Sequence, residues 1–162
     1  MCASRRARPG RKDDVTMTAD DRLEIQELYS RWCVLLDTGQ AEAWARLFTA
    51  DGVFVFEALE VRASGFEELW AFAADVHQRE RGLTRHYMHN VLIDPYAGGA
   101  RGRADIELLD LRAGGDARIV KTAHYEDRLQ QTDRGWCFVE RHLYWDTPEA
   151  PADIGTKQWD QS

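Results

Sequence analysis

The order of the hydrophobic patterns constrains this fold more than any other feature of the sequence. Up to residue 82 most apolar residues recur at helical spacing, whereas from residue 84 onward long strand-like segments follow one another. Short turns rich in Gly and Asp separate these segments, which predicts antiparallel pairing of consecutive strands. Helices first and a sheet afterwards, in a chain of 162 residues, indicate a single α+β domain. The four expected strands are residues 84–94, 100–111, 118–130 and 136–145.

The first two helices follow from residue spacing. Thr18 and Asp21 are placed as in a capping box, and the helix they open should end at Asp37. Its apolar residues recur at intervals typical of a helix. They are Leu23, Ile25, Leu28, Trp32, Leu35 and Leu36. The apolar face of a second, short helix should consist of Ala41, Trp44, Leu47 and Phe48.

A third helix should close the first half of the chain. Ser64 and Glu67 repeat the capping pattern at its start, and it should fray near Gly82. Before it, the apolar run 53–56 predicts a buried strand, on which residues 59–62 can pair back. Three helices therefore precede the four long strands.

Charge is unevenly distributed and limits the classes of partner. Residues 1–16 hold five basic and two acidic side chains, a net charge of +3. The whole chain has a net charge of −7, so residues 17–162 carry −10. An acidic body argues against binding to nucleic acid, whose phosphates require clustered Lys and Arg. The apolar runs are far shorter than the roughly 20 residues that span a bilayer. We expect a disordered extension over 1–16, the domain over 17–146, and a tail or flap over 147–162.

The three cysteines indicate neither a disulfide framework nor a metal site. Cys2, Cys33 and Cys137 are odd in number and lack metal-ligand spacing, and the last two lie in apolar patterns. Reduced core cysteines point to the cytoplasm. His86 and His89 are three residues apart on a strand, so they face opposite sides and cannot chelate one ion together without a bulge. We expect no metal and no cofactor.

Three groups of residues follow one another in a recognisable order. The segment Ile25-Gln26-Glu27-Leu28-Tyr29 lies in the first helix, Thr84 to Asn90 opens the first long strand, and Asp133, Gly135-Trp136 and Arg141 belong to the last hairpin. Over residues 20–145 this order resembles the SnoaL-like family of the nuclear transport factor two-like superfamily. The resemblance implies a cone-shaped α+β barrel, in which three N-terminal helices pack in the concave face of a curved, mainly antiparallel sheet. It also implies a pocket for a small hydrophobic molecule at the open end.

Asp37 and His86 are the expected catalytic residues. The carboxylate falls at the end of the first helix, and period-two alternation puts Met88, Asn90 and Leu92 on the same strand face as His86. A carboxylate bound to one imidazole nitrogen fixes the tautomer and leaves the other nitrogen as a general base. The alternative is that Asp37 only ends the helix and His86 is a hydrogen-bonded histidine without a catalytic role.

The resemblance extends to this pair. Asp37 and His86 match the Asp-His dyad of hexachlorocyclohexane dehydrochlorinase and are similar to the dyads of scytalone dehydratase and bile-acid dehydratase. The helper group of these enzymes is missing, because Trp32 stands where a lysine or tyrosine is expected and Leu36 where scytalone dehydratase has a tyrosine. The residues expected to bind the substrate, some of which could replace the helper, are Tyr29, Trp32, Asn90, His124 and Tyr125.

The expected function is cofactor-independent acid–base chemistry on a small hydrophobic molecule. The reaction would be an elimination or dehydration, an isomerisation or a cyclisation, carried out by a lyase or isomerase. The alternative is a non-catalytic ligand-binding or structural subunit that resembles the β subunit of ring-hydroxylating dioxygenases. An epoxide hydrolase of the limonene type is disfavoured, because its Asp-Arg-Asp set has no evident counterpart. We also expect a homodimer or homotrimer, formed through an outer sheet face that carries Tyr87, Val91 and Ile93.

Overall fold

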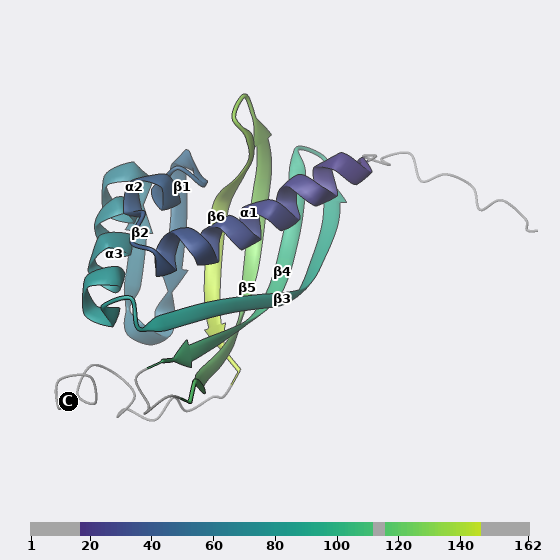
Figure 1. The fold of residues 1–162 in the computed structure, drawn as a ribbon. Helices are drawn as coiled ribbons and strands as arrows, with labels where there is room; N and C mark the ends of the chain where they lie inside the picture. The colour runs from purple at the N-terminus through teal and green to yellow at the C-terminus, as the bar shows by residue number, and fades with distance from the viewer. Residues whose placement is uncertain (1–16, 112–115, 147–162) are drawn as a thin grey trace, which may run out of the picture.

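In the computed structural model, which describes residues 17–111 and 116–146, the three helices precede the four long strands as expected, and two further strands lie between the second and third helices (Figure 1). Segments 1–16 and 147–162 lie outside the described residues, so the extension and the tail stay predictions. The helices are α1 (Ala19–Asp37), α2 (Ala41–Ala45) and α3 (Gly65–Glu80), with a 3₁₀ turn η1 (Glu57–Leu59). The strands are β1 (Phe48–Phe56), β2 (Val61–Ser64), β3 (Thr84–Tyr96), β4 (Gly99–Asp110), β5 (Arg118–Thr132) and β6 (Gly135–Trp145).

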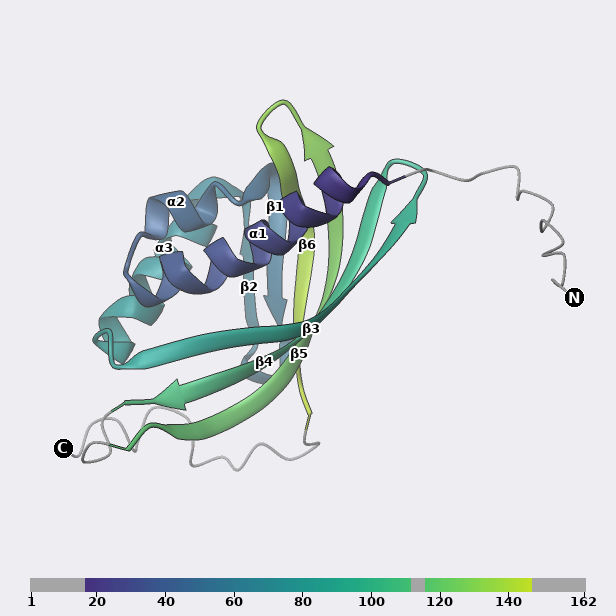
Figure 2. The ribbon, with the colours of Figure 1, turned by 45° about the vertical axis from the view of Figure 1, so that its right-hand side comes forward.

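Helix α1 begins at the predicted capping box and supplies much of the core. The Thr18 hydroxyl accepts from the backbone N–H of Asp21 at 3.1 Å, and the Asp21 carboxylate accepts from the backbone N–H of Thr18 at 2.8 Å. One face of the helix is then buried against the concave side of the sheet (Figure 2). The buried residues are Ile25, Leu28, Tyr29, Trp32, Cys33 and Leu36.

Helix α2 is shorter than the spacing predicted. It ends at Ala45, and Phe48 is the first residue of β1 instead of part of a helical face. The backbone N–H of Phe138 donates to the carbonyl of Leu47 at 2.9 Å, and Phe48 pairs with Phe138 in parallel. Because of this long-range pairing with β6, Phe48 belongs to the sheet. Local periodicity carries no information about a pairing between distant residues.

The start of α3 also differs in detail. Ser64 is the N-cap residue, as predicted, but its side chain makes no capping hydrogen bond. Its backbone N–H donates to the carboxylate of Glu68 at 2.8 Å, so Glu68 takes the role expected of Glu67. The reciprocal bond of a capping box is replaced by a single carboxylate contact at the positive end of the helix, where the dipole favours it.

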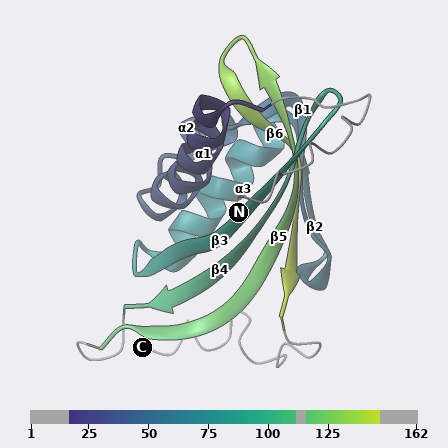
Figure 3. The same ribbon diagram turned by 90° about the vertical axis from the view of Figure 1, so that its right-hand side faces the viewer.

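The sheet has six strands in the order β2-β1-β6-β5-β4-β3. All neighbours pair antiparallel except β1 and β6, which are parallel, so the predicted meander from β3 to β6 is confirmed. The sheet curves around the helices, as Figure 3 shows from the side. It stays open, because within the described residues its edge strands β2 and β3 do not pair with each other. The α+β architecture with helices in the concave face is confirmed.

A bulge in β3 reverses the expected alternation of its side chains. The pairing of β3 with β4 shifts around Asn90, whose φ of 52° is left-handed. One extra residue moves every later side chain to the opposite face. Val91 and Ile93 therefore pack in the core, whereas Tyr87 and Leu92 are 55% and 63% exposed. The prediction that Val91 and Ile93 lie on the outer face was wrong for this reason.

Two findings bear on the environment of the chain. Cys33 and Cys137 are buried free thiols, and burial raises the pKa of the Cys33 thiol to about 12. Across residues 17–111 and 116–146, no helix is both long and apolar enough to cross a membrane. The cytoplasmic location stays a prediction.

Candidate functional site

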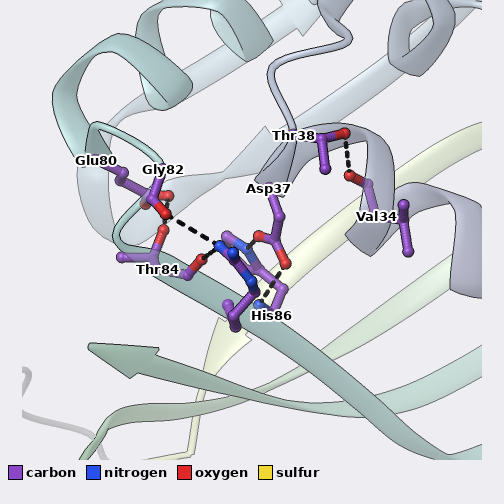
Figure 4. A network of polar contacts seen from close by, with 8 residues as sticks. Val34, Asp37, Thr38, Glu80, Gly82, Thr84 and His86 are labelled. Atoms are coloured by element: carbon purple, nitrogen blue, oxygen red, sulfur yellow. Dashed lines mark hydrogen bonds and ion pairs between the residues drawn. The ribbon is translucent and has the colours of Figure 1, made fainter. Parts of the chain in front are cut away.

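Asp37 and His86 form a hydrogen-bonded pair where the end of α1 meets the start of β3 (Figure 4). Asp37 Oδ1 lies 2.6 Å from His86 Nδ1, and Asp37 Oδ2 accepts a 3.0 Å hydrogen bond from the backbone N–H of His86. One carboxylate thus holds both the ring and the backbone of the histidine. The side chains of Asp37 and His86 are only 7% and 11% exposed, so the pair is largely shielded from solvent but not fully buried. The expected contact is present, and its catalytic role stays a prediction.

Local structure fixes both partners of the pair (Figure 4). Helix α1 ends directly after Asp37, because Gly39 adopts a left-handed φ of 71° and the Thr38 hydroxyl donates to a helix carbonyl at 2.6 Å. At the start of β3, the buried Thr84 donates its hydroxyl hydrogen to the carboxylate of Glu80 at the end of α3. These contacts hold the pair between two helix ends and one strand.

The bonding of Asp37 determines which histidine nitrogen is available for chemistry. An ionised carboxylate only accepts hydrogen bonds, so the proton of a neutral His86 is assigned to Nδ1. Nε2 then keeps its lone pair, and among the described residues it has no hydrogen-bond partner. The negative end of the α1 dipole disfavours a carboxylate at this position, and the two N–H groups of His86 offset that cost. The arrangement is that of a general base held by an orienting carboxylate.

Trp32 connects the pair to an aromatic cluster in the core. Its ring centroid lies 5.7 Å from that of His86, with the rings at 87° to each other. It also lies 5.2 Å from the ring of Tyr125 and 5.6 Å from that of Trp44. Trp32 is 2% exposed, and its indole N–H has no partner within the described part of the chain. The indole N–H groups of Trp44 and Trp145 are buried without a partner in the same way, so this condition does not single out Trp32.

A second polar group is buried near Trp32, whose ring centroid lies 4.7 Å from Cζ of Arg141. The side chains of Asp127 and Arg141 are fully buried, with Oδ1 and Nε 3.5 Å apart. Asp127 Oδ2 accepts a 2.5 Å hydrogen bond from the hydroxyl of Tyr29. Burial raises the pKa of Asp127 to about 6, although the charge of Arg141 acts in the opposite direction. Burial also raises the pKa values of the Tyr29 and Tyr125 hydroxyls, so both tyrosines are neutral hydrogen-bonding groups.

These two clusters occur in a chain whose family can be identified. The sequence of residues 17–142 matches the family of SnoaL-like domains. This chain belongs to the SnoaL-like family. The resemblance found in the sequence is therefore confirmed. Among curated proteins, none matches the sequence.

Solved structures share the fold of this chain. The chain is similar to Rv3472 of Mycobacterium tuberculosis, whose function is unknown, with 26% identity, a TM-score of 0.73, and 86% of this chain and 82% of that chain covered. An NTF2-like protein with a cystatin-like fold from Novosphingobium aromaticivorans is 22% identical, with a TM-score of 0.73 and coverage of 83% and 88%. A Catenulispora acidiphila protein in complex with S-DNPA is 24% identical, with a TM-score of 0.69 and coverage of 80% and 96%.

Three of the five expected substrate-binding residues of this SnoaL-like protein lie on the concave side, and two do not. Tyr29, Trp32 and Tyr125 are buried in the core beside the pair and the arginine. Asn90 is exposed, because the bulge turns it outward, and its amide donates to the Asp105 carboxylate at 2.8 Å. The Asn90 side chain therefore lies away from the Asp37–His86 pair.

His124 also lies on the outer face of the sheet. Its strand neighbours Ala123 and Tyr125 are buried on the inner face, so alternation along β5 turns His124 outward. There its Nδ1 lies 2.9 Å from Asp146 Oδ1 and its ring stacks on Tyr144 at 5.4 Å. His124 and Tyr125, both expected to bind the substrate, therefore lie on opposite faces of the sheet, and only Tyr125 shares the concave face with the pair.

Sequence reasoning did not predict that Asp127 and Arg141 lie together in the core. A signal was present, because Asp127 alternates with the buried residues Tyr125 and Leu129 and so must lie on the apolar face of β5. Arg141 follows a pairing irregularity between β5 and β6, which obscures its face in the sequence. Only the sheet register places the two side chains together.

Neither a metal cluster nor the surface groove competes with the pair as the candidate site. Within the described residues, no group of three His, Cys, Asp or Glu side chains could hold a metal ion. A groove of about 860 Å³ lies between α1, α2 and the β5–β6 hairpin, away from His86. Two of its charged lining residues, Arg31 and Arg46, pair with glutamates on their own helices at 2.7 and 2.8 Å, and a third, Arg134, donates to two backbone carbonyls at 3.1 Å. The described lining residues of the groove include no histidine.

Proposed function

We propose that this SnoaL-like protein is an acid–base enzyme that removes a proton from carbon in a small, mainly apolar molecule, with His86 as general base and Asp37 as its orienting residue. The 2.6 Å contact between Asp37 and His86 Nδ1, which leaves Nε2 without a partner among the described residues, carries the proposal. Partly exposed apolar side chains on the same concave side supply the environment for such a substrate. They are Met88, Leu143 and Trp145.

One step is common to the reactions considered. Elimination, isomerisation and aldol-type cyclisation each require the removal of a proton from carbon, and none of them requires a redox cofactor. A general base held at a fixed orientation contributes typically about 10²–10⁴-fold to such a step. The similar Catenulispora acidiphila structure in complex with S-DNPA supports ligand binding by proteins of this fold.

Hydrogen exchange at carbon tests the proposal without knowledge of the natural substrate. 2-Tetralone is a small apolar ketone with acidic C–H groups, and loss of its proton NMR signals in D₂O measures proton removal. We expect the wild type to accelerate the exchange, and His86→Gln and Asp37→Asn each to lower the rate by about 10²-fold or more. Because the two residues act as a unit, the double variant should lose little more than either single variant.

His89→Gln is the matched control. His89 lies on the same strand and faces a carboxylate, Glu107, at 3.7 Å, but its side chain is 45% exposed on the outer face of the sheet. This variant should exchange 2-tetralone at the wild-type rate. A wild-type protein that is no faster than His86→Gln, or equal losses in the His86 and His89 variants, would contradict a role of His86 as base and favour a binding or structural subunit.

A further inference from the structure

Lys121 on strand β5 is the only lysine between residues 17 and 146 of the sequence. The second and fourth residues after it, Ala123 and Tyr125, are buried in the core. Because side chains alternate along a strand, Lys121 lies on the same concave face of the sheet. Its side chain is partly exposed, so its charge is accessible from solvent.

An aromatic contact supports this placement of Lys121. Its Nζ lies 4.5 Å from the centroid of the Trp145 ring, a distance typical of a cation–π contact. Trp145 pairs with Ala123 across β5 and β6 and packs against the core, where its ring lies 4.8 Å from that of Phe56. The carbon chain of a lysine can lie along apolar surface while its charged end stays accessible. The ammonium is therefore held beside an aromatic wall of the concave face.

The register of the sheet places Lys121 in the same cross-strand row as the candidate base. His86 on β3 pairs with Leu108 on β4, and Leu108 pairs with Lys121 on β5. This row lies near the end of the sheet where β3 begins, and Figure 3 shows the three strands side by side there. Neighbouring strands lie about 4.8 Å apart, so the Cα atoms of His86 and Lys121 are about 10 Å apart. A small molecule lying over Leu108 can therefore contact both side chains.

Lys121 also has no opposite charge beside it. Exposed arginines elsewhere in the chain pair with carboxylates, as Arg31 does with Glu27 at 2.7 Å. Among the described residues, no carboxylate forms an ion pair with Lys121, whose ammonium contacts the ring of Trp145 instead. A cation beside an apolar wall attracts an anion more strongly than a cation in open water, because the wall lowers the local dielectric.

We propose that Lys121 binds a carboxylate of the substrate while His86 removes a proton from carbon at the other end of the same molecule, an inference that rests on the proposed function. A lysine ammonium is a single point charge without the planar fork of an arginine, so it suits one monovalent group. Residues 17–162 carry a net charge of −10, which disfavours a more highly charged group such as a phosphate. The substrate class is then a mainly apolar carboxylic acid with an acidic C–H group.

The row also determines how far apart the two ends of this substrate lie. Both side chains project from one face, so the separation of their charged or basic ends is of the same order as that of the strands, roughly 10 Å. A contact of about 3 Å at each end leaves space for one or two rings over Leu108. Met88 and Ile106, which pair in the next row, add apolar surface beside it. A compact cyclic acid matches this spacing.

Two ligands that differ in charge test this site in the full chain. 2-Tetralone-6-carboxylate carries its anionic group on the ring opposite the acidic CH₂ group, and 2-tetralone-6-carboxamide has nearly the same shape without the charge. Titration calorimetry measures the affinity for each ligand and requires no turnover. We expect the wild type to bind the carboxylate about tenfold more tightly than the amide, the lower end of the range for charge-assisted contacts, because Lys121 is partly exposed.

Substitutions at Lys121 show whether this residue causes the preference. Lys121→Met keeps an unbranched side chain against Trp145 and removes the charge, so it should bind the two ligands with equal affinity. Lys121→Gln is a second neutral variant, for which we expect the same result, and Lys121→Arg should keep the preference. Arg128→Met is the matched control, because Arg128 lies on the outer face of the same strand, is 56% exposed and pairs with Glu140 at 3.2 Å. It changes the net charge equally and should keep the tenfold preference.

The outcomes separate this inference from the proposed function. A wild type that binds the carboxylate no more tightly than the amide would overturn the anion site, even if it accelerates the hydrogen exchange of 2-tetralone. A preference that survives in Lys121→Met or Lys121→Gln would also overturn it, as would an equal loss in Arg128→Met. His86→Gln should keep the preference for the carboxylate while it loses the exchange activity, so a failure of His86 as base leaves the anion site intact.

Discussion

Replacing Gly102 by alanine should disrupt the buried hydrogen bond between Tyr29 and Asp127. Gly102 lies on the inner face of β4, opposite Asp127 on β5. A Cβ at Gly102 would lie 2.0 Å from the hydroxyl oxygen of Tyr29, and the next atom, a methyl carbon of Leu129, would be 3.1 Å away. The hydroxyl must move by more than about 1 Å to reach a normal contact distance, and its 2.5 Å bond to Asp127 cannot survive that shift.

The size of the effect follows from three contributions. Overpacking of a well-packed core costs about 1–3 kcal/mol, and a buried carboxyl oxygen left without its donor costs about 1–3 kcal/mol. The alanine recovers about 0.4–1 kcal/mol by restricting the unfolded chain. Gly102→Ala should therefore lower the free energy of unfolding by about 1–5 kcal/mol. In a Tyr29→Phe background the obstructing oxygen is gone, and the same substitution should cost less than about 1 kcal/mol.

Urea unfolding of the four proteins in this cycle, followed by tryptophan fluorescence at one pH and one protein concentration, measures the coupling. Parallel transitions with the same m value are required for the comparison. The reasoning fails if Gly102→Ala costs less than about 0.5 kcal/mol, or if it costs the same with and without the Tyr29 hydroxyl. Either outcome would show that Tyr29 and Asp127 are not held together in the way the structure indicates.

Three further predictions concern pH, assembly and the amino terminus. Because the folded-state pKa of Asp127 is raised from 3.8 to about 6, the folded state binds its proton more tightly, and the free energy of unfolding should fall as pH rises through this interval. The fall is on the order of 3 kcal/mol. If the stability of the wild type depends on pH in the same way as that of Asp127→Asn, the raised pKa of Asp127 is excluded as its cause. Light scattering at micromolar concentration should give a mass above the 18.6 kDa of one chain. The double substitution Tyr87→Glu and Leu92→Glu should reduce this mass. A wild-type mass of 18.6 kDa would rule out the expected dimer or trimer. Deletion of 1–16 should leave the melting temperature nearly unchanged, since the segment contains little apolar surface to bury, and a large drop would show that it packs on the domain.

The candidate pair was predictable because each half depends on local rules. The capping box and spacing of α1 determine where the helix ends, and its last residue is Asp37. The strand that begins at Thr84 places His86 two residues later, on the same side as the helices. The prediction that the two side chains lie in contact came from the family resemblance, because residue spacing alone does not contain the long-range arrangement.

The sequence by itself determined the three helices, the meander from β3 to β6 that follows them and the identity of the pair, because periodicity, capping and turn chemistry act over a few neighbouring residues. Only the tertiary structure decided the outward turn of Asn90 at a bulge, the parallel pairing of Phe48 with Phe138, and the burial of Arg141 against Asp127. Each of these depends on which residues of a distant strand lie opposite, and a shift of one residue reverses the face of a side chain. The register of the assembled sheet, which no local pattern encodes, therefore selects the groups that surround His86.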